Sequence, residues 1–197
     1  MISKEEFDKV FKAAVTETNA AFPFLFTVVT TTYDGDRVNS TETMVNERHA
    51  AGVERMKTTW ATKDTTKTVH QLKTGFGTVF CSEDGNTWTG PDKYECPNPS
   101  GARRIYGPRQ PENSEYTVEE SMIDGKGVKI YREYLVFASS NDANRKVFQE
   151  KAATVDSGGL LLSILGSEGT LGPRRVTLTR MQTWKINEKF DPIVAPR

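Results

Sequence analysis

The stretch FLFTVVTTTYDGD, residues 24–36, indicates the kind of fold this chain adopts. Apart from Leu25, every residue from Phe24 to Tyr33 is aromatic or β-branched, and these types are enriched in β-strands. An Asp-Gly pair after such a run is typical of a tight hairpin turn. The stretch therefore predicts a long strand that turns directly into a second, antiparallel strand.

The residues before this strand have a different pattern. Ser3 and Glu6 match a capping box, in which the two residues satisfy each other's free backbone N–H groups at a helix start. Pro23 is expected to end the helix. We therefore predict one amphipathic helix over residues 4–20 that packs on the sheet. Its apolar side chains recur at helical spacing: Phe7, Val10, Phe11, Ala14 and Val15.

The residues after the first hairpin read as a series of further strands. Short apolar or β-branched runs alternate with turn residues and show no intervening helix, which favours an antiparallel meander. We predict an α+β fold, mainly antiparallel β, in a single domain over residues 1–197. A meander of about ten strands must curl into a barrel, a half-barrel or a sandwich. The predicted strands are 38–48, 52–60, 69–72, 78–81, 93–96, 117–123, 128–137, 146–155, 160–165 and 174–186.

The region from Pro97 to Pro111 is predicted to be a loop because it is rich in proline and glycine. A short strand over residues 104–106 could interrupt it. A short helical lid over residues 111–116 or 141–147 is the other local expectation.

The only two cysteines, Cys81 and Cys96, lie at the ends of one turn-rich stretch. Their spacing is too long for a redox pair, and no third cysteine or nearby histidine completes a zinc site. Two strand ends joined by turns can bring the cysteines within disulfide distance. We predict this disulfide, and with it a periplasmic or extracellular location. The alternative is two unrelated buried thiols in a cytosolic protein.

Composition excludes several classes of partner. Lys plus Arg and Asp plus Glu are each 26, so no broad basic field is available for nucleic acid. No segment approaches the ~18 consecutive apolar residues of a membrane helix. The first residues do not form a signal peptide, so any such peptide is expected to be absent from this sequence.

Catalytic and metal-binding motifs are missing from the sequence. It contains no G-x-S-x-G elbow, H-E-x-x-H pair or phosphate-binding loop. His49 and His70 are expected on the surface, and Gly158-Gly159 in a turn. We therefore expect no enzymatic activity, no cofactor and no metal. The alternative is a hydrolase whose paired carboxylates come together only in the folded chain.

The last predicted strand carries an unusual face. Val176, Leu178, Arg180, Gln182, Trp184 and Ile186 alternate onto one side, and an unpaired charge in a dry core would be costly. Either Arg180 lies at the rim or pairs with a carboxylate, or this face is a cavity wall whose cation meets a polar head group. Further candidates for the wall are Leu162 and Ile164, with either Phe24 and Phe26 or their neighbours Leu25 and Thr27. Alternation places Leu160, Leu162 and Ile164 on one face, and Leu161 and Leu165 on the other.

Several turn motifs occur in a characteristic order after the first helix and strand. They are DGNTW at 84–88, DGKGVKIY at 124–131, VDSGGL at 155–160 and a final strand whose tail ends at Pro196. In this layout the chain resembles the periplasmic lipoprotein-carrier superfamily, which includes LolA- and LolB-like carriers and related bacterial lipid-binding lipoproteins. The resemblance implies a strongly curved half-barrel, closed by helices, with an apolar cavity for acyl chains.

Two functions are expected from these features. The first is non-enzymatic binding or transport of a hydrophobic or amphipathic ligand, such as a lipid or lipoprotein acyl chains, with an envelope protein as a conceivable partner. The second is a protein-interaction or scaffold domain whose sheet face is filled by its own side chains.

Overall fold

The computed structural model describes residues 1–75, 79–92, 96, 110–139 and 145–196. Within these residues one helix, α1 (Lys4–Ala20), precedes eleven strands. The strands are β1 (Phe24–Asp34), β2 (Arg37–Ala50), β3 (Val53–Thr62), β4 (Thr66–Thr74), β5 (Val79–Ser82), β6 (Thr89–Asp92), β7 (Asn113–Ile123), β8 (Lys126–Ala138), β9 (Lys146–Asp156), β10 (Leu161–Leu171) and β11 (Arg175–Ile186).

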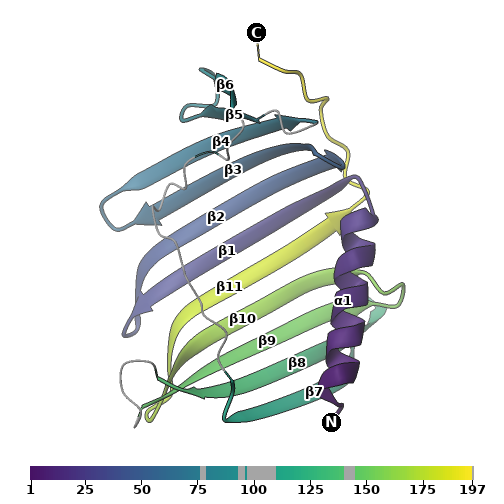
Figure 1. Ribbon diagram of the computed structural model, residues 1–197, viewed down its shortest axis with the longest axis vertical. Helices are drawn as coiled ribbons and strands as arrows, with labels where there is room; N and C mark the ends of the chain where they lie inside the picture. The colour runs from purple at the N-terminus through teal and green to yellow at the C-terminus, as the bar shows by residue number, and fades with distance from the viewer. Residues whose placement is uncertain (76–78, 93–95, 97–109, 140–144, 197) are drawn as a thin grey trace.

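All the strands form one curled sheet in which every neighbouring pair is antiparallel. The order is β6-β5-β4-β3-β2-β1-β11-β10-β9-β8-β7, so two meanders meet where β1 pairs with β11. Within the described residues β6 and β7 are the two edges, so the sheet does not close into a barrel (Figure 1). The predicted α+β class with a half-barrel and an N-terminal helix is confirmed.

The centre of the sheet is the strand that the opening stretch predicted. β1 pairs with β11 from Phe24↔Ile186 to Thr32↔Leu178, and with β2 from Phe24↔Arg48 to Asp34↔Arg37. Its side chains are buried or half-buried along most of its length. With β2 on one side and β11 on the other, β1 has its backbone paired along both edges.

Helix α1 lies across one end of strands β7 to β11, on one face of the sheet (Figure 1). Its start is the predicted one, because Ser3 Oγ accepts a hydrogen bond from the Glu6 backbone N–H at 3.1 Å. The ring of Phe7 lies 5.4 Å from that of Tyr116 on β7. The core beneath the helix consists of Ala14, Ala153, Val155, Leu161 and Ile164, with Phe11, Val15, Tyr131 and Trp184 packed around it.

A β-bulge in β10 overturns the alternation predicted for its leucines. The register shifts between Leu161 and Ser163, so Leu161 and Ile164 both enter the core under α1, where strict alternation had placed them on opposite faces. At the bulge the Leu161 N–H donates to Thr18 Oγ1 of α1 at 2.8 Å. The bulge thus links the helix to the sheet through a fully buried hydroxyl.

The predicted hairpin around Asp124-Gly125 is confirmed. Both residues have positive φ, 51° and 75°, as the tight turns that match strand twist require. Its first strand starts earlier than predicted, because β7 already includes Asn113. The proposed lid over 111–116 is therefore wrong there: the segment pairs with β8.

Other local predictions concern segments after β5. Residues 89–92, which lie in the stretch predicted to be rich in turns, form β6, which pairs with β5. The predictions of a strand over 93–96 and over 104–106, and of a lid over 141–147, fall wholly or mainly outside the described residues. Of the segment 141–147, Lys146 and Val147 belong to β9.

The loop after β5 is organised by Asp84. Its carboxylate accepts hydrogen bonds from the backbone N–H groups of Thr87 and Asn86 and from the Ser82 hydroxyl. These donors stabilise the ionised form and hold the pKa of Asp84 well below its usual range. The DGNTW motif is therefore a side-chain-stabilised turn, as predicted for its first residues.

Cys81 and Cys96 form the predicted disulfide, with their Cα atoms 5.6 Å apart. Cys81 lies on β5, while Cys96 follows β6 in sequence and donates its backbone N–H to the Gln71 side chain on β4 at 3.3 Å. The bond therefore ties the segment after β6 back onto the edge of the sheet.

Replacing both cysteines by alanine is expected to lower the free energy of unfolding by about 3 kcal/mol, because the bond closes a loop of 15 residues in the unfolded chain. Urea unfolding followed by circular dichroism measures the loss. Wild-type protein treated with a reductant should match the variant. An unchanged midpoint, or two titratable thiols in the unfolded, non-reduced protein, would contradict the bond.

Thr18→Val is expected to destabilise the protein by about 1–3 kcal/mol, because valine keeps the shape but leaves the buried Leu161 N–H without an acceptor. Thr16→Val is the matched control: its hydroxyl bonds only to the Lys12 carbonyl on the exposed side of the same helix. The control should stay within about 0.5 kcal/mol of wild type in urea unfolding. Equal effects of the two substitutions would show that the helix–bulge bond is unimportant.

Candidate functional site

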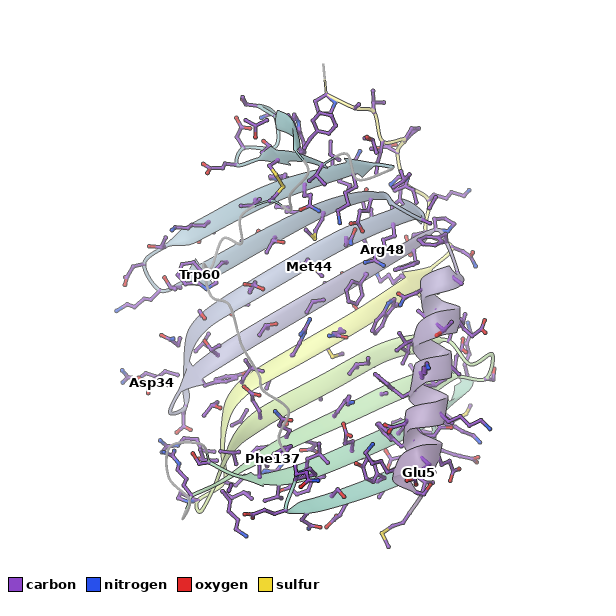
Figure 2. The ribbon with its side chains drawn as sticks, viewed as in Figure 1. Glu5, Asp34, Met44, Arg48, Trp60 and Phe137 are labelled. Atoms are coloured by element: carbon purple, nitrogen blue, oxygen red, sulfur yellow. A yellow bond between two sulfur atoms is a disulfide. The ribbon has the colours of Figure 1, made fainter. Side chains whose placement is uncertain are left out.

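A cavity of about 570 Å³ lies on the face of the sheet that α1 partly covers. We call it the concave groove. It crosses strands from β3 to β8, with the β1–β11 seam at its centre. Figure 2 shows Met44 midway along β2 and Trp60 on β3 toward the sheet end away from α1. Its lining is Val28, Thr30, Thr32, Ser40, Glu42, Met44, Trp60, Glu133, Gln149, Glu150, Lys151, Ile164, Gly166, Ser167, Glu168, Leu178, Arg180 and Gln182.

The floor of the groove is apolar. Val28, Ile164 and Leu178 are buried and come from three adjacent strands, β1, β10 and β11. Met44 adds a half-buried flexible side chain from β2. An apolar floor bordered by polar groups is typical of small-molecule sites.

A polar row crosses the middle of the groove at right angles to the strands. The sheet register places Glu42 beside Thr30 and Thr30 beside Arg180. Trp60 precedes Glu42 in this row, on β3. Beyond Arg180 the row continues through Gly166, Lys151 and Glu133, on β10, β9 and β8.

Some of the charges along the groove are satisfied within the protein. Lys151 lies 2.8 Å from Glu133 and also stands over the ring of Phe11, 4.5 Å from its centroid. Glu150 pairs with Arg174 at 2.8 Å. Lys151 therefore serves to attach α1 to the sheet.

Arg180 and Glu42 differ from these pairs. Arg180 is exposed, Glu42 is half-buried, and neither makes an ion pair or side-chain hydrogen bond in the part of the chain that the structure describes. Gly166 lies next to Arg180, and a Cβ added there would meet only backbone oxygens at 3.8 and 3.9 Å. No side chain therefore occupies the position next to Arg180 in the row.

A buried polar cluster closes the concave face toward the α1 end of β2 and β3. Glu54 accepts a hydrogen bond from the Asn46 side chain at 2.9 Å. It also forms ion pairs with Arg48 at 3.2 Å and with Lys73 at 2.8 Å. Burial alone would raise the pKa of Glu54, but hydrogen bonds from Lys73 and Asn46 and the charges of Lys73 and Arg48 outweigh it and lower the pKa. This carboxylate is thus ionised and holds three strands together.

The structure separates the predicted ligand-binding residues into two groups. Ile164, Leu178 and Arg180 line the concave groove. Phe26 packs on Trp184 with ring centroids 4.8 Å apart, next to the core under α1. Phe24 is fully buried against Phe22 and Arg48, and Leu162 is half-buried at the bulge. None of these last four lines the groove.

The sequence left open which face of β1 points into the cavity, that of Phe24 and Phe26 or that of Leu25 and Thr27. Val28, Thr30 and Thr32 line the groove, so the even-numbered side of β1, with Phe24 and Phe26, faces inward. Sequence reasoning missed Glu42, Met44 and Trp60. Their strands were predicted, but only the register of β2 and β3 against β1 reveals that they share a face with Arg180.

The described residues contain no group of three or more His, Cys, Asp or Glu side chains that could hold a metal ion. None of their helices is long and apolar enough to span a membrane.

Comparison with known proteins adds little. No family model matches the chain, and no curated protein matches it. A crystal structure of LprF from Mycobacterium bovis is similar, with a TM-score of 0.47 and 11% sequence identity over 98% of this chain and 97% of that chain. The function is therefore inferred below from the residues of the groove themselves.

Glu54→Gln is expected to destabilise the protein by roughly 1.5–3 kcal/mol at neutral pH, because Arg48 and Lys73 lose their shared carboxylate. The pKa of Glu54 is lowered on folding, so its contribution is complete above its ordinary pKa of 4.5 and is lost as pH falls through the lower folded value. The gap between variant and wild type in urea unfolding should therefore narrow in acid.

Glu47→Gln is the control for this prediction. Glu47 lies on the same strand as Arg48, next to it and so on the opposite face of the sheet, and pairs with the half-exposed Arg55 at 3.2 Å. Its loss should cost at most about 1 kcal/mol. Equal losses for the two variants, or a gap that widens in acid, would contradict the account of the cluster.

Proposed function

We propose that this protein binds an amphipathic ligand, with an apolar chain and a polar head, in the concave groove, and that it does so without catalysis. The observation that carries the proposal is the combination of an apolar floor and an available cation in one partly open cavity. Val28, Ile164 and Leu178 form the floor, and Arg180 stands beside it.

The floor suits an acyl chain. Each methylene moved from water onto apolar surface contributes about 0.8 kcal/mol, so even part of a chain supplies substantial binding energy. The cavity volume of about 570 Å³ lies within the usual range for small-molecule sites. Met44 adds adaptability, because its side chain can follow an irregular ligand.

The polar side of the groove suits a head group better than catalysis. Arg180 is exposed, so its charge stays hydrated until a ligand binds. The free protein therefore does not carry the energetic cost of burying this charge. Glu133 and Glu150 are held in ion pairs with Lys151 and Arg174, which leaves them poor candidates for a general acid.

The alternative is a scaffold domain whose concave face is filled by its own side chains. The volume of the concave groove favours a guest over that alternative, since a face filled by its own side chains has few voids larger than a water molecule. The disulfide supports an oxidising compartment outside the cytoplasm. Binding there would serve storage or transport of lipids or of lipoprotein acyl chains, with an envelope protein as the partner.

The proposal predicts saturable binding of single-chain amphiphiles. Titration with a long-chain fatty acid and with a lysophospholipid should shift the tryptophan fluorescence, because Trp60 lines the groove. Leu178→Glu, which places a charge in the apolar floor, should weaken binding at least about tenfold. Native mass spectrometry of protein purified without detergent should show retained lipid.

Leu165→Glu is the matched control. Leu165 lies on β10, next to β11, and is 49% exposed outside the groove, so this charge should leave binding unchanged. Met44→Glu supplies a second groove variant in case Leu178→Glu unfolds the protein. Absence of saturable binding of both amphiphiles, or equal loss with Leu165→Glu, would favour the scaffold alternative.

A further inference from the structure

The polar row of the groove places opposite charges a fixed distance apart. Glu42 on β2 and Arg180 on β11 flank Thr30 on β1 in register. Because neighbouring strands are about 4.8 Å apart, the two backbones are about 10 Å apart across the seam. Both side chains have several flexible bonds, so together they can close on a ligand group shorter than that separation.

Neither charge is neutralised by the described part of the protein. Two other charge pairs in or beside the groove, Lys151–Glu133 and Arg174–Glu150, are closed at 2.8 Å. The charged side chains of these two pairs are therefore neutralised, whereas Glu42 and Arg180 remain available to a ligand. A ligand that carries both signs would satisfy both at once.

The negative end of the row has an aromatic neighbour. Trp60 pairs directly with Glu42 across the β2–β3 ladder, and both line the groove. A tryptophan face beside a carboxylate is the combination that attracts quaternary ammonium groups, which have no N–H to donate. The Trp60 side chain is half-buried, lines the groove and has no aromatic partner among the described residues.

The positive end has room for an anion. Gly166 follows Arg180 in the row and leaves open the space that a side chain would fill. The next cation, Lys151, is engaged by Glu133 and by the rings of α1. One available guanidinium, with a glycine and no side chain next to it in the row, fits one phosphate group, which arginine can bind with two parallel hydrogen bonds.

A purely anionic head group fits this groove poorly. It would meet Arg180 but would also lie near Glu42, which lines the groove in the same row. Like charges brought together at a binding site disfavour the wrong ligand. The row therefore selects against an acid that has no compensating cation.

We propose that the concave groove recognises a zwitterionic phosphate–ammonium head group of the phosphocholine type, with the phosphate at Arg180 and the quaternary ammonium between Glu42 and Trp60. This inference rests on the proposed function, since the apolar chain of the same ligand occupies the floor beside Leu178. It names the class of amphiphile that the groove takes.

Calorimetric titration with ligands that share one acyl or alkyl chain tests the head-group assignment. Lysophosphatidylcholine should bind at least about tenfold more tightly than lysophosphatidic acid, which lacks the ammonium, and than an alkyltrimethylammonium, which lacks the phosphate. Glu42→Gln and Trp60→Leu should each weaken lysophosphatidylcholine binding by about 5- to 30-fold while leaving or raising the affinity for lysophosphatidic acid. Arg180→Gln should weaken binding of both phospholipids.

Glu47→Gln, on the opposite face of the same strand as Glu42, and Trp88→Leu, outside the groove lining, are the matched controls and should leave the preference intact. Circular dichroism melts verify that each variant is folded. Glycerophosphocholine distinguishes a lipid from a free head group. It should bind far more weakly than lysophosphatidylcholine, because it lacks the chain.

Each outcome has one meaning. Equal affinities for all head groups, or a phosphocholine preference that Glu42→Gln and Trp60→Leu do not reduce, would overturn the head-group assignment while the proposed amphiphile binding stands. Glycerophosphocholine bound as tightly as the lipid would support the head-group subsite but overturn the role of the apolar floor. No binding of any of these ligands would overturn both proposals.

Discussion

The backbone pairing of β1 with β11 is the contact on which the rest of the structure depends. It joins residues near the start of the chain to residues near its end and so merges two separate meanders into one sheet. Without it, β1 and β11 would each be an edge strand whose unpaired backbone groups face water and other chains. The same seam lies at the centre of the concave groove, because Thr30 and Arg180 are register partners.

Helix α1 then determines which part of the concave face stays open. The bulge in β10 directs Leu161 and Ile164 to the same side, and Thr18 accepts the N–H that the bulge leaves free. Lys151 fixes the start of the helix through the rings of Phe7 and Phe11. The helix lies over one end of β7 to β11 (Figure 1). The cavity that Arg180 lines lies over the middle of the sheet.

Local chemistry made much of the fold predictable from the sequence. Ser3 and Glu6 mark the start of α1, the residues of β1 favour an extended chain, and Asp124-Gly125 supplies the left-handed backbone of a hairpin. The bulge at Leu162 was not predictable from local sequence. It depends on the Thr18 hydroxyl of α1, which lies 143 residues before Leu161, the residue whose N–H it accepts.

The groove was predictable only in part, for a related reason. The side chains on one strand follow from alternation, so Leu178 and Arg180 could be placed together. The partners of Arg180 across the sheet could not, because Glu42 and Trp60 join its row only through the β1–β11 register, and no local pattern encodes the register of strands so far apart in sequence. Short strands such as β6 were missed because turn residues dominate their composition.

The most direct test of the account is a crystal structure with lysophosphatidylcholine whose acyl chain carries bromine. The account predicts an anomalous bromine peak over the floor formed by Val28, Ile164 and Leu178, with the phosphate within hydrogen-bond distance of Arg180. A bromine peak on the opposite face of the sheet, near Leu165 and Met181, would contradict it. So would a groove that remains empty at ligand concentrations that saturate the protein in solution.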